Sequence, residues 1–296
     1  MSEPDQGRPF KVPPFRLARP ARPPTPLIVC SPHSGQHYPA AFRAGARLDL
    51  TALRRAEDAF VDELFADAPD LGAPLLAATH ARSYLDVNRE PYELDPAMFE
   101  DTLPGFVNVA SPRVRSGFGT IPSQVAGAGA IYAGKLTFAE AEQRLARIYR
   151  PYHETLGGLI AEAKARYGFA VVLDCHSMPS SGIVLGDRRP GPLPDAVLGD
   201  RFGNSCEALI VEAAERSLRR AGYHVRRNDP YAGGFTTEFY GRPASGVHTL
   251  QIELNRALYM DETRHAKRDG FEPLRADMGR LVTVLGDLAL PALAAE

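Results

Sequence analysis

The chain has 296 residues, of which 44% are hydrophobic and 24% charged, a composition typical of a globular protein with a sizeable buried core. Its net charge of −2 and its scattered basic residues argue against a nucleic-acid-binding protein, and no apolar run is long enough to cross a membrane. Three widely separated cysteines and the lack of a signal-peptide pattern lead us to expect a cytoplasmic protein.

The first part of the chain predicts an arm followed by a folded domain. Residues 1–25 are rich in proline and arginine without clear periodicity, so we expect an extended N-terminal arm. Residues 26–296 contain no repeat and no linker, and we expect them to form a single α/β domain. A buried strand is predicted over 26–30, followed by a Ser-Pro-His-Ser-Gly loop at 31–35.

An amphipathic helix is predicted over 50–68, and a strand over 74–78. Residues 90–135 lack periodicity and are rich in glycine and proline, so we expect a lid or a wall of a substrate site there. A capping box at Thr137 opens a helical stretch over 137–167, which Pro151 divides. The remaining predictions are an apolar run at 182–186, helices at 204–221 and 270–289, strands at 169–173, 223–227 and 246–254, and a glycine-rich loop at 228–236.

Two of the predicted strands are followed by the same pair of residue types. The run at 169–173 leads into Asp-Cys-His-Ser, which places His176 after it, and the strand at 26–30 leads to His33. In an α/β sheet, polar residues beyond the carboxyl ends of strands lie where ligands bind. A single histidine is more often a hydrogen-bonded core residue, but two strand ends that each present His-Ser indicate a shared site.

A catalytic zinc site uses three protein ligands and keeps one position open. His33 and His176 would supply two nitrogens, and the third ligand is expected from the acidic segment after the first histidine. We favour Asp58, with Glu57 and Asp62 as alternatives. One Zn²⁺ per chain would lower the pKa of bound water and so generate a nucleophile near neutral pH.

Glu253 is the best candidate for the carboxylate that accepts a proton from this water, because it interrupts an otherwise apolar strand. The alternative is a structural ion pair with Arg256 or another arginine. Arg82 and Arg89 are candidates for holding a carboxylate of the substrate, since guanidinium offers a planar pair of donors. Either could instead be a surface arginine.

These pieces together resemble the N-formylglutamate amidohydrolase family. The resemblance extends from about residue 27 to about residue 262, and its motifs are specific as a set although each alone is weak. The matching motifs are Ser31-Pro32-His33-Ser34-Gly35, Glu57-Asp58-Ala59-Phe60-Val61-Asp62-Glu63-Leu64, Tyr84-Leu85-Asp86-Val87-Asn88-Arg89, Asp174-Cys175-His176-Ser177, Pro230-Tyr231-Ala232-Gly233-Gly234 and Gln251-Ile252-Glu253-Leu254-Asn255-Arg256.

The resemblance implies a three-layer α/β sandwich like that of zinc carboxypeptidases, with a mixed, mostly parallel sheet and helices on both faces. It also implies that His33, Asp58 and His176 bind zinc and that Glu253 is catalytic. By the same likeness, Asn88 and Arg89 bind a substrate carboxylate and Arg82 assists. The implied activity is hydrolysis of N-formyl-L-glutamate to formate and glutamate.

One position departs from the carboxypeptidase pattern, which has a glutamate three residues after the first histidine. That position is Gln36 here, so the acidic ligand must come from elsewhere. Related activities compatible with the same residues are deacylation of other N-acyl amino acids and cleavage of peptides by a carboxypeptidase-like enzyme. A non-catalytic protein that binds an amino-acid-like anion is the alternative of another class. The partner we expect is a small anionic molecule, and no pattern specifies an oligomeric state.

Overall fold

The structure is a computed structural model that describes residues 12–21, 24–181 and 194–288. Its centre is a seven-stranded sheet. The strands of this sheet are Phe15–Ala18 (β1), Leu27–Ser31 (β2), Leu75–Ala78 (β3), Ala170–Met178 (β6), Ala196–Gly199 (β7), Val225–Arg227 (β8) and Val247–Asn255 (β9). Their order is β1-β3-β2-β6-β9-β7-β8. The central β3, β2, β6 and β9 run parallel, whereas β1, β7 and β8 run in the opposite direction.

Helices of very different lengths connect these strands. The α-helices are Ala40–Ala44 (α1), Leu50–Arg54 (α2), Val61–Leu64 (α3), Pro112–Arg115 (α4), Phe138–Arg144 (α5), Arg150–Tyr167 (α6), Ala208–Arg220 (α7), Phe235–Tyr240 (α8) and Phe271–Gly286 (α9). Short 3₁₀ turns lie at Pro69–Leu71, Pro96–Met98, Pro243–Ser245 and Arg256–Leu258, and small ladders pair Gln124–Val125 (β4) with Gly129–Ala130 (β5) and Met260–Asp261 (β10) with Ala266–Lys267 (β11). Among the described residues, no helix is both long and apolar enough to span a bilayer.

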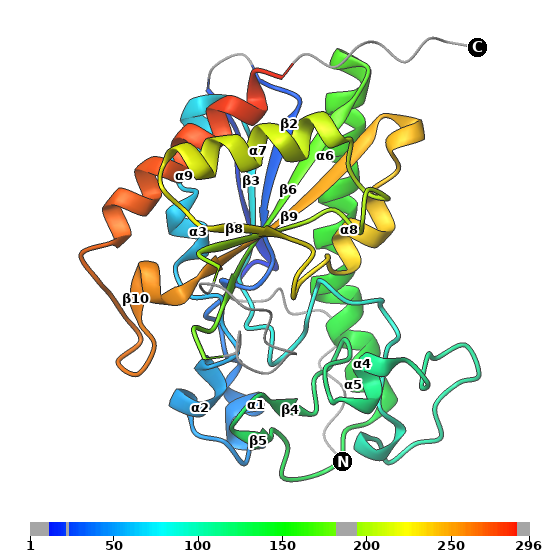
Figure 1. Cartoon of the computed structure of the whole chain (residues 1–296). Coiled ribbons are helices and arrows are strands. Elements are labelled where there is room, and N and C mark those ends of the chain that lie inside the picture. Colours follow the sequence, from blue (N-terminus) through cyan, green and yellow to red (C-terminus); the bar gives the residue numbers. More distant parts are fainter. Residues whose placement is uncertain (1–11, 22–23, 182–193, 289–296) are drawn as a thin grey trace.

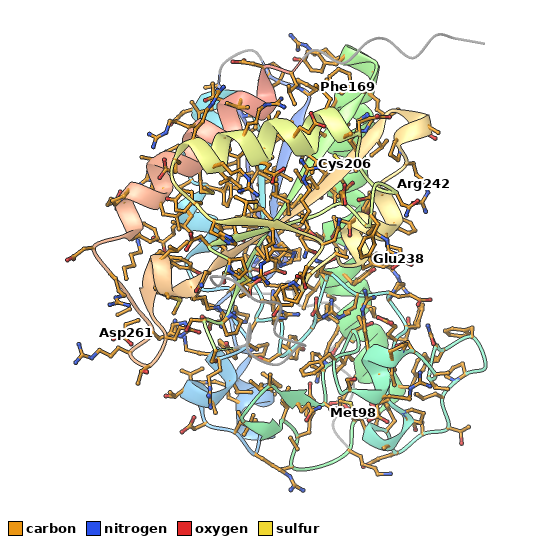
Figure 2. All side chains as sticks on the ribbon, in the orientation of Figure 1. Met98, Phe169, Cys206, Glu238, Arg242 and Asp261 are labelled. Atoms are coloured by element: carbon orange, nitrogen blue, oxygen red, sulfur yellow. The ribbon has the colours of Figure 1, made fainter. Side chains whose placement is uncertain are left out.

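Helices cover both faces of the sheet (Figure 1), and apolar side chains form a core on each face. Figure 2 adds the side chains of the described residues to the same view. In β2, Leu27 and Val29 join the core beneath α3, α7 and α9. The alternate residues Ile28 and Cys30 point to the opposite face and pack with residues of α6. Successive strand residues point to opposite faces, so a wholly buried strand needs apolar residues at every position. The predicted three-layer α/β fold with a mixed, mostly parallel sheet is confirmed.

Part of the expected N-terminal arm belongs to the sheet. Residues 15–18 form the edge strand β1, which pairs antiparallel with β3, so that Phe15 lies opposite Ala78. Residues 1–11 lie outside the described part of the chain, as does the apolar run predicted at 182–186. Strand β7 was not predicted, because four apolar residues between turns carry too little periodicity to identify a strand.

The prediction of one helix over 50–68 was wrong. The chain forms α2 and then α3, and between them Phe60 adopts a left-handed backbone conformation with φ of 64°. This break means that Asp58 and Asp62 do not share one helix face. By contrast, the capping box at Thr137 is present, and α5 passes through a π-helical turn at Leu145–Tyr149 into α6, which has Pro151 in its first turn.

The strand predicted to end at residue 173 continues to Met178, so Asp174 and His176 lie within β6 rather than beyond it. All nine residues of β6 are buried. Polar side chains are tolerated there because they bond to one another at the carboxyl edge of the sheet. The other long predicted elements are present as β9, α7 and α9 with shifted ends.

Candidate metal centre

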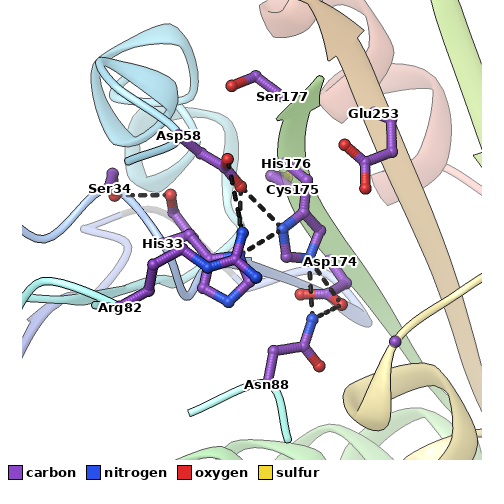
Figure 3. A network of polar contacts seen from close by, with 12 residues as sticks. His33, Ser34, Asp58, Arg82, Asn88, Asp174, Cys175, His176, Ser177 and Glu253 are labelled. Carbon is purple, nitrogen blue, oxygen red and sulfur yellow. Dashed lines mark hydrogen bonds and ion pairs between the residues drawn. The ribbon is translucent and has the colours of Figure 1, made fainter. Parts of the chain in front are cut away.

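The candidate site lies at the carboxyl ends of three adjacent parallel strands. His33 follows β2, His176 is in β6, and Glu253 is in β9. His176 and Glu253 are direct register partners on neighbouring strands. Their side chains therefore reach the same edge of the sheet, as Figure 3 shows.

Asp58 reaches this edge from the break between α2 and α3. Its backbone N–H donates to the carbonyl oxygen of His33 at 3.0 Å, which fastens the acidic segment to the loop after β2. The carboxylate then points at both histidines (Figure 3). Because a continuous helix would bond this N–H within itself, the break is what brings the carboxylate into the site.

Three candidate ligand atoms converge in this place. Oδ2 of Asp58 lies 3.2 Å from Nδ1 of His33 and 3.0 Å from Nδ1 of His176, and the two Nδ1 atoms are 3.0 Å apart. All three residues are buried. In a tetrahedral zinc site with bonds of about 2.0–2.2 Å, ligand atoms are about 3.3–3.5 Å apart, only a few tenths of an ångström wider. The donor set therefore fits a divalent transition-metal ion.

A buried carboxylate contacts the Nε2 atom of each histidine, on the side of the ring away from the other candidate ligands. Nε2 of His33 lies 2.7 Å from Oδ1 of Asp86, and Nε2 of His176 lies 3.1 Å from Oδ2 of Asp174. When each Nε2–H donates to its carboxylate, both Nδ1 lone pairs face the centre. Two lone pairs at 3.0 Å repel each other unless a cation lies between them. Such carboxylate–histidine pairs are the usual support of metal-binding histidines.

The charges of the cluster keep Asp58 and Asp86 ionised. Burial disfavours the charged form of Asp58, but hydrogen bonds from His176 and His33 outweigh it and hold the pKa of Asp58 well below its usual value. For Asp86, burial is likewise outweighed by Arg89, His33 and Arg82, so its pKa is also well below the usual value. Burial lowers the pKa of His176, yet Asp174 and Asp58 raise it well above its ordinary value.

Glu253 has the opposite shift. Its pKa is raised to about 7, chiefly by desolvation, while His176 lowers it and the Asp58 carboxylate raises it. The Gln251 side-chain N–H donates to Oε1 of Glu253 at 3.1 Å. A carboxyl group with a pKa near neutrality can both accept and release a proton at physiological pH.

The two arginines predicted to bind a carboxylate both lie beside Asp86. Arg82 donates to Oδ2 of Asp86 at 2.9 Å, and Nη2 of Arg89 lies 3.8 Å from the same oxygen. Nη1 of Arg82 is also 4.0 Å from Oδ1 of Asp58. Both guanidinium groups line the same cavity as the candidate ligands.

Asn88 lines this cavity too, but its amide group is engaged within the protein. Its Nδ2 lies 3.0 Å from both Oδ2 of Asp174 and Nε2 of His176. Its Oδ1 accepts from the backbone N–H and the hydroxyl of Thr236. In this arrangement Asn88 connects the start of α8 to the histidine–carboxylate pair.

The cavity has a volume of about 590 Å³, a size that suits a small molecule. Part of its wall comes from the 90–135 region, through Arg113, Phe118 and Val125, so the stretch predicted to form a lid or wall lies at the candidate site. The glycine-rich loop at 230–234 also lines the cavity. Arg113 is only loosely paired, with Nη1 at 3.7 Å from Oε2 of Glu93.

The two alternatives to Asp58 point elsewhere. Glu57 is buried among Tyr38, Arg54 and His265, with its Oε1 accepting from Tyr38 at 2.6 Å. Asp62 forms an ion pair with Arg16 of β1. The structure therefore brings Asp58, and neither of these neighbours, to the histidines.

Sequence reasoning missed the supporting residues of the site. Asp174 precedes His176 by two positions, and strand alternation places both on one face, so this signal was present in the sequence. Asp86 lies in a stretch of turns, so the alternation of apolar and polar residues along 81–89 does not correspond to a strand and does not give the direction of its side chain. Arg256 was considered only as a partner of Glu253, but it donates to Oδ1 of Asp58.

Comparisons with known proteins identify relatives of the chain. A family model described as N-formylglutamate amidohydrolase matches residues 25–260. N-formylglutamate deformylase of Pseudomonas aeruginosa is 32% identical over 240 residues, which is 80% of this chain and 83% of that protein. The Pseudomonas putida deformylase is 30% identical over 241 residues, again covering 80% and 83%. The crystal structure of N-formylglutamate amidohydrolase from Ralstonia eutropha has a TM-score of 0.89 and 42% identity, covering 94% of this chain and 99% of that one.

Proposed function

The chain belongs to the N-formylglutamate amidohydrolase family, and on that premise we propose that it hydrolyses N-formyl-L-glutamate to formate and L-glutamate with one Zn²⁺ per chain. The reaction breaks a carbon–nitrogen amide bond, as the name of the family implies. The observation that carries the metal dependence is the convergence of Asp58 and two carboxylate-backed histidines on one point.

His33, Asp58 and His176 would hold the ion, which when bound would supply a Lewis acid and lower the pKa of water. Glu253 accepts a proton from water as the new carbon–oxygen bond forms at the formyl carbon. It then delivers that proton to the amide nitrogen as the carbon–nitrogen bond breaks, which releases the amine of glutamate and formic acid. The acid loses its remaining proton to the amine, so the products are formate and glutamate with a charged ammonium group. The pKa of Glu253, raised to about 7, suits both transfers.

Arg82 and Arg89 supply positive charge on the wall of the cavity, and we assign them to a substrate carboxylate together with Asn88. Their pairing with Asp86 orients the guanidinium groups without filling every donor position. A dicarboxylate such as N-formylglutamate carries two negative charges, and a cavity lined by several arginines is electrostatically suited to it.

The variant Asn88→Ala tests whether Asn88 binds the substrate or supports the metal site. If the amide holds the substrate, KM rises while zinc content stays at one ion per chain. If its internal bonds to Asp174 and Thr236 are its main contribution, zinc affinity falls instead. Steady-state kinetics and zinc analysis on the same preparation separate the two results.

The decisive experiment for the function measures zinc content and formate release from N-formyl-L-glutamate, comparing the native chain with His176→Ala. We expect one zinc per native chain, and loss of both zinc and formate release in the variant. The matched control is His224→Ala, because His224 precedes β8 and lies outside the residues that line the cavity.

The outcomes distinguish the remaining activities. Zinc binding without formate release would move the substrate to another N-acyl amino acid or a peptide, which a panel of N-acetyl-L-glutamate and glutamate-ended dipeptides would identify. A native chain that binds no zinc and stays inactive after zinc is added would contradict the enzyme and leave an anion-binding protein.

A further inference from the structure

Arg256 is a buried arginine that lines the candidate cavity and donates hydrogen bonds to several groups of the protein. It begins the 3₁₀ turn after β9 and is 7% exposed. Its Nε donates to the hydroxyl of Ser177 at 3.1 Å, and its Nη1 donates to the carbonyl oxygen of Arg55 at 3.3 Å. Its Nη2 donates to Oδ1 of Asp58 at 3.0 Å. The guanidinium group therefore joins the end of β6, the break before α3 and the candidate metal ligand.

The two oxygens of Asp58 face different partners. Oδ2 lies 3.0–3.2 Å from the Nδ1 atoms of the two histidines. Oδ1 is turned away from them, with Arg256 at 3.0 Å and Arg82 at 4.0 Å. The carboxylate is thus held with one edge toward the site and the other toward the arginines.

We propose that Arg256 is a positioning residue that makes Asp58 offer only Oδ2 to the metal ion, which keeps a coordination position open for water and substrate. The inference rests on the metal site of the proposed function. A catalytic zinc site needs such an open position beside three protein ligands. A carboxylate free to turn could instead bind through both oxygens, and with the water this would make five ligand atoms and leave no position for the substrate.

Charge alone does not explain an arginine at this place. A positive group 3.0 Å from a metal ligand weakens the attraction of that carboxylate for a cation. What Arg256 adds is direction, since its planar fork reaches Asp58 and Ser177 at the same time. Lysine would retain the charge but not this fork.

The test uses Co²⁺ added to the metal-free protein, because four-coordinate Co²⁺ absorbs visible light several-fold more strongly than five- or six-coordinate Co²⁺. We compare the native chain with Arg256→Met and Arg256→Lys. The native chain should show the intense spectrum and the Met variant a several-fold weaker one at equal cobalt content, with Lys between them.

With zinc and N-formyl-L-glutamate, kcat of the Met variant should fall about 10- to 100-fold. KM of the Met variant should change little, because the N–H groups of Arg256 donate to Ser177, Arg55 and Asp58.

The matched control is Arg54→Met. Arg54 donates to Glu57 at 3.1 Å and so supports the residue next to Asp58 without touching Asp58 itself. We expect its cobalt spectrum to equal that of the native chain. An equal change in both variants would mean that Arg256 only stabilises the surrounding backbone, and the proposal would be overturned.

The remaining outcomes separate a failure of this inference from a failure of the proposed function. An unchanged spectrum in Arg256→Met overturns the proposal, and if that variant does not fold, an unchanged spectrum in Arg256→Lys overturns it. A native chain that binds neither Co²⁺ nor Zn²⁺ defeats the proposed metal-dependent function together with this inference. Native metal binding with unaltered Arg256 variants defeats this inference alone.

Discussion

Glu253 combines a raised pKa with a position opposite His176 in the register of the sheet. We expect Glu253→Gln to keep its zinc and lose about 10²- to 10⁴-fold in kcat, because the amide cannot accept a proton. Glu162→Gln, which removes a carboxylate from the exposed surface of α6, is the control and should leave kcat unchanged. A variant that retained native kcat would assign the base to another residue.

The same group predicts the pH dependence of the reaction. A general base works in its deprotonated form, so kcat/KM should rise with pH through the pKa of Glu253, which is about 7 in the metal-free site. A bound cation favours the carboxylate and lowers this value, so the midpoint of the rise should lie at or below pH 7. A pH–rate profile of the native enzyme measures it, and a midpoint well above 7 would contradict the assignment.

Asp174 is fully buried and lies 3.1 Å from Nε2 of His176. In Asp174→Asn the amide can present an N–H to Nε2, which favours the imidazole tautomer that carries its proton on Nδ1. We therefore expect zinc affinity or activity to fall about 10- to 100-fold, measured by competition with a coloured chelator. Asp277→Asn on α9 removes a carboxylate outside the cavity, and equal losses in both variants would refute the orienting role.

How well single residues could be predicted depended on the element that carries them. His33, His176 and Glu253 were found because each belongs to or directly follows a buried strand with a clear apolar pattern. Asp58 was favoured without knowledge of the break at Phe60, although in the structure this break is what turns Asp58, rather than Glu57 or Asp62, toward the histidines. No sequence signal marks a phenylalanine for a left-handed conformation, which bulky residues rarely adopt.

At the scale of elements, the stretch from α5 to α6 shows which local signals are reliable. The Thr137 hydroxyl accepts from the N–H of Glu140, and the Glu140 carboxylate accepts from the N–H of Thr137. Both bonds are local, so the pattern needed no knowledge of the fold. The single helix predicted over 50–68 failed because tertiary contacts of its central residues outweigh their helical periodicity.

Thr137→Ala should therefore reduce the free energy of unfolding by about 1 kcal/mol and leave kcat unchanged, since α5 starts away from the residues that line the cavity. Thr283→Ala, in the interior of α9, is a suitable comparison because alanine is the better helix former there. Urea denaturation of both variants measures the difference. Equal stability of the two variants would mean that the capping box contributes nothing.

At the scale of the whole molecule, the bound metal ion should stabilise the folded state. A ligand that binds only the folded state stabilises it by about 2.7 kcal/mol at a concentration of 100 times Kd. We expect chelation to lower Tm by several degrees and added Zn²⁺ to restore it. Neither chelation nor added Zn²⁺ should change Tm of His176→Ala. If Tm of this variant changed as much as that of the native chain, the ion would bind at another site.

The overall architecture was more predictable than its edges. The central parallel strands β2, β6 and β9 carry long or strongly apolar patterns, so they and the helices around them were recognisable. Strands β1, at one edge of the sheet, and β7, next to the other edge, have four residues each, and their pairing depends on partners distant in sequence. Short elements of this kind are determined by tertiary contacts rather than by local preference.

The three candidate ligands come from different segments of the chain, and His33 and His176 are 143 positions apart. Closing such a loop costs conformational entropy before any contact compensates for it. A newly made chain therefore cannot assemble the site until β6 has emerged and joined β2. Metal capture during synthesis would be a late event that follows the docking of the central strands, and an unfinished chain would hold zinc poorly.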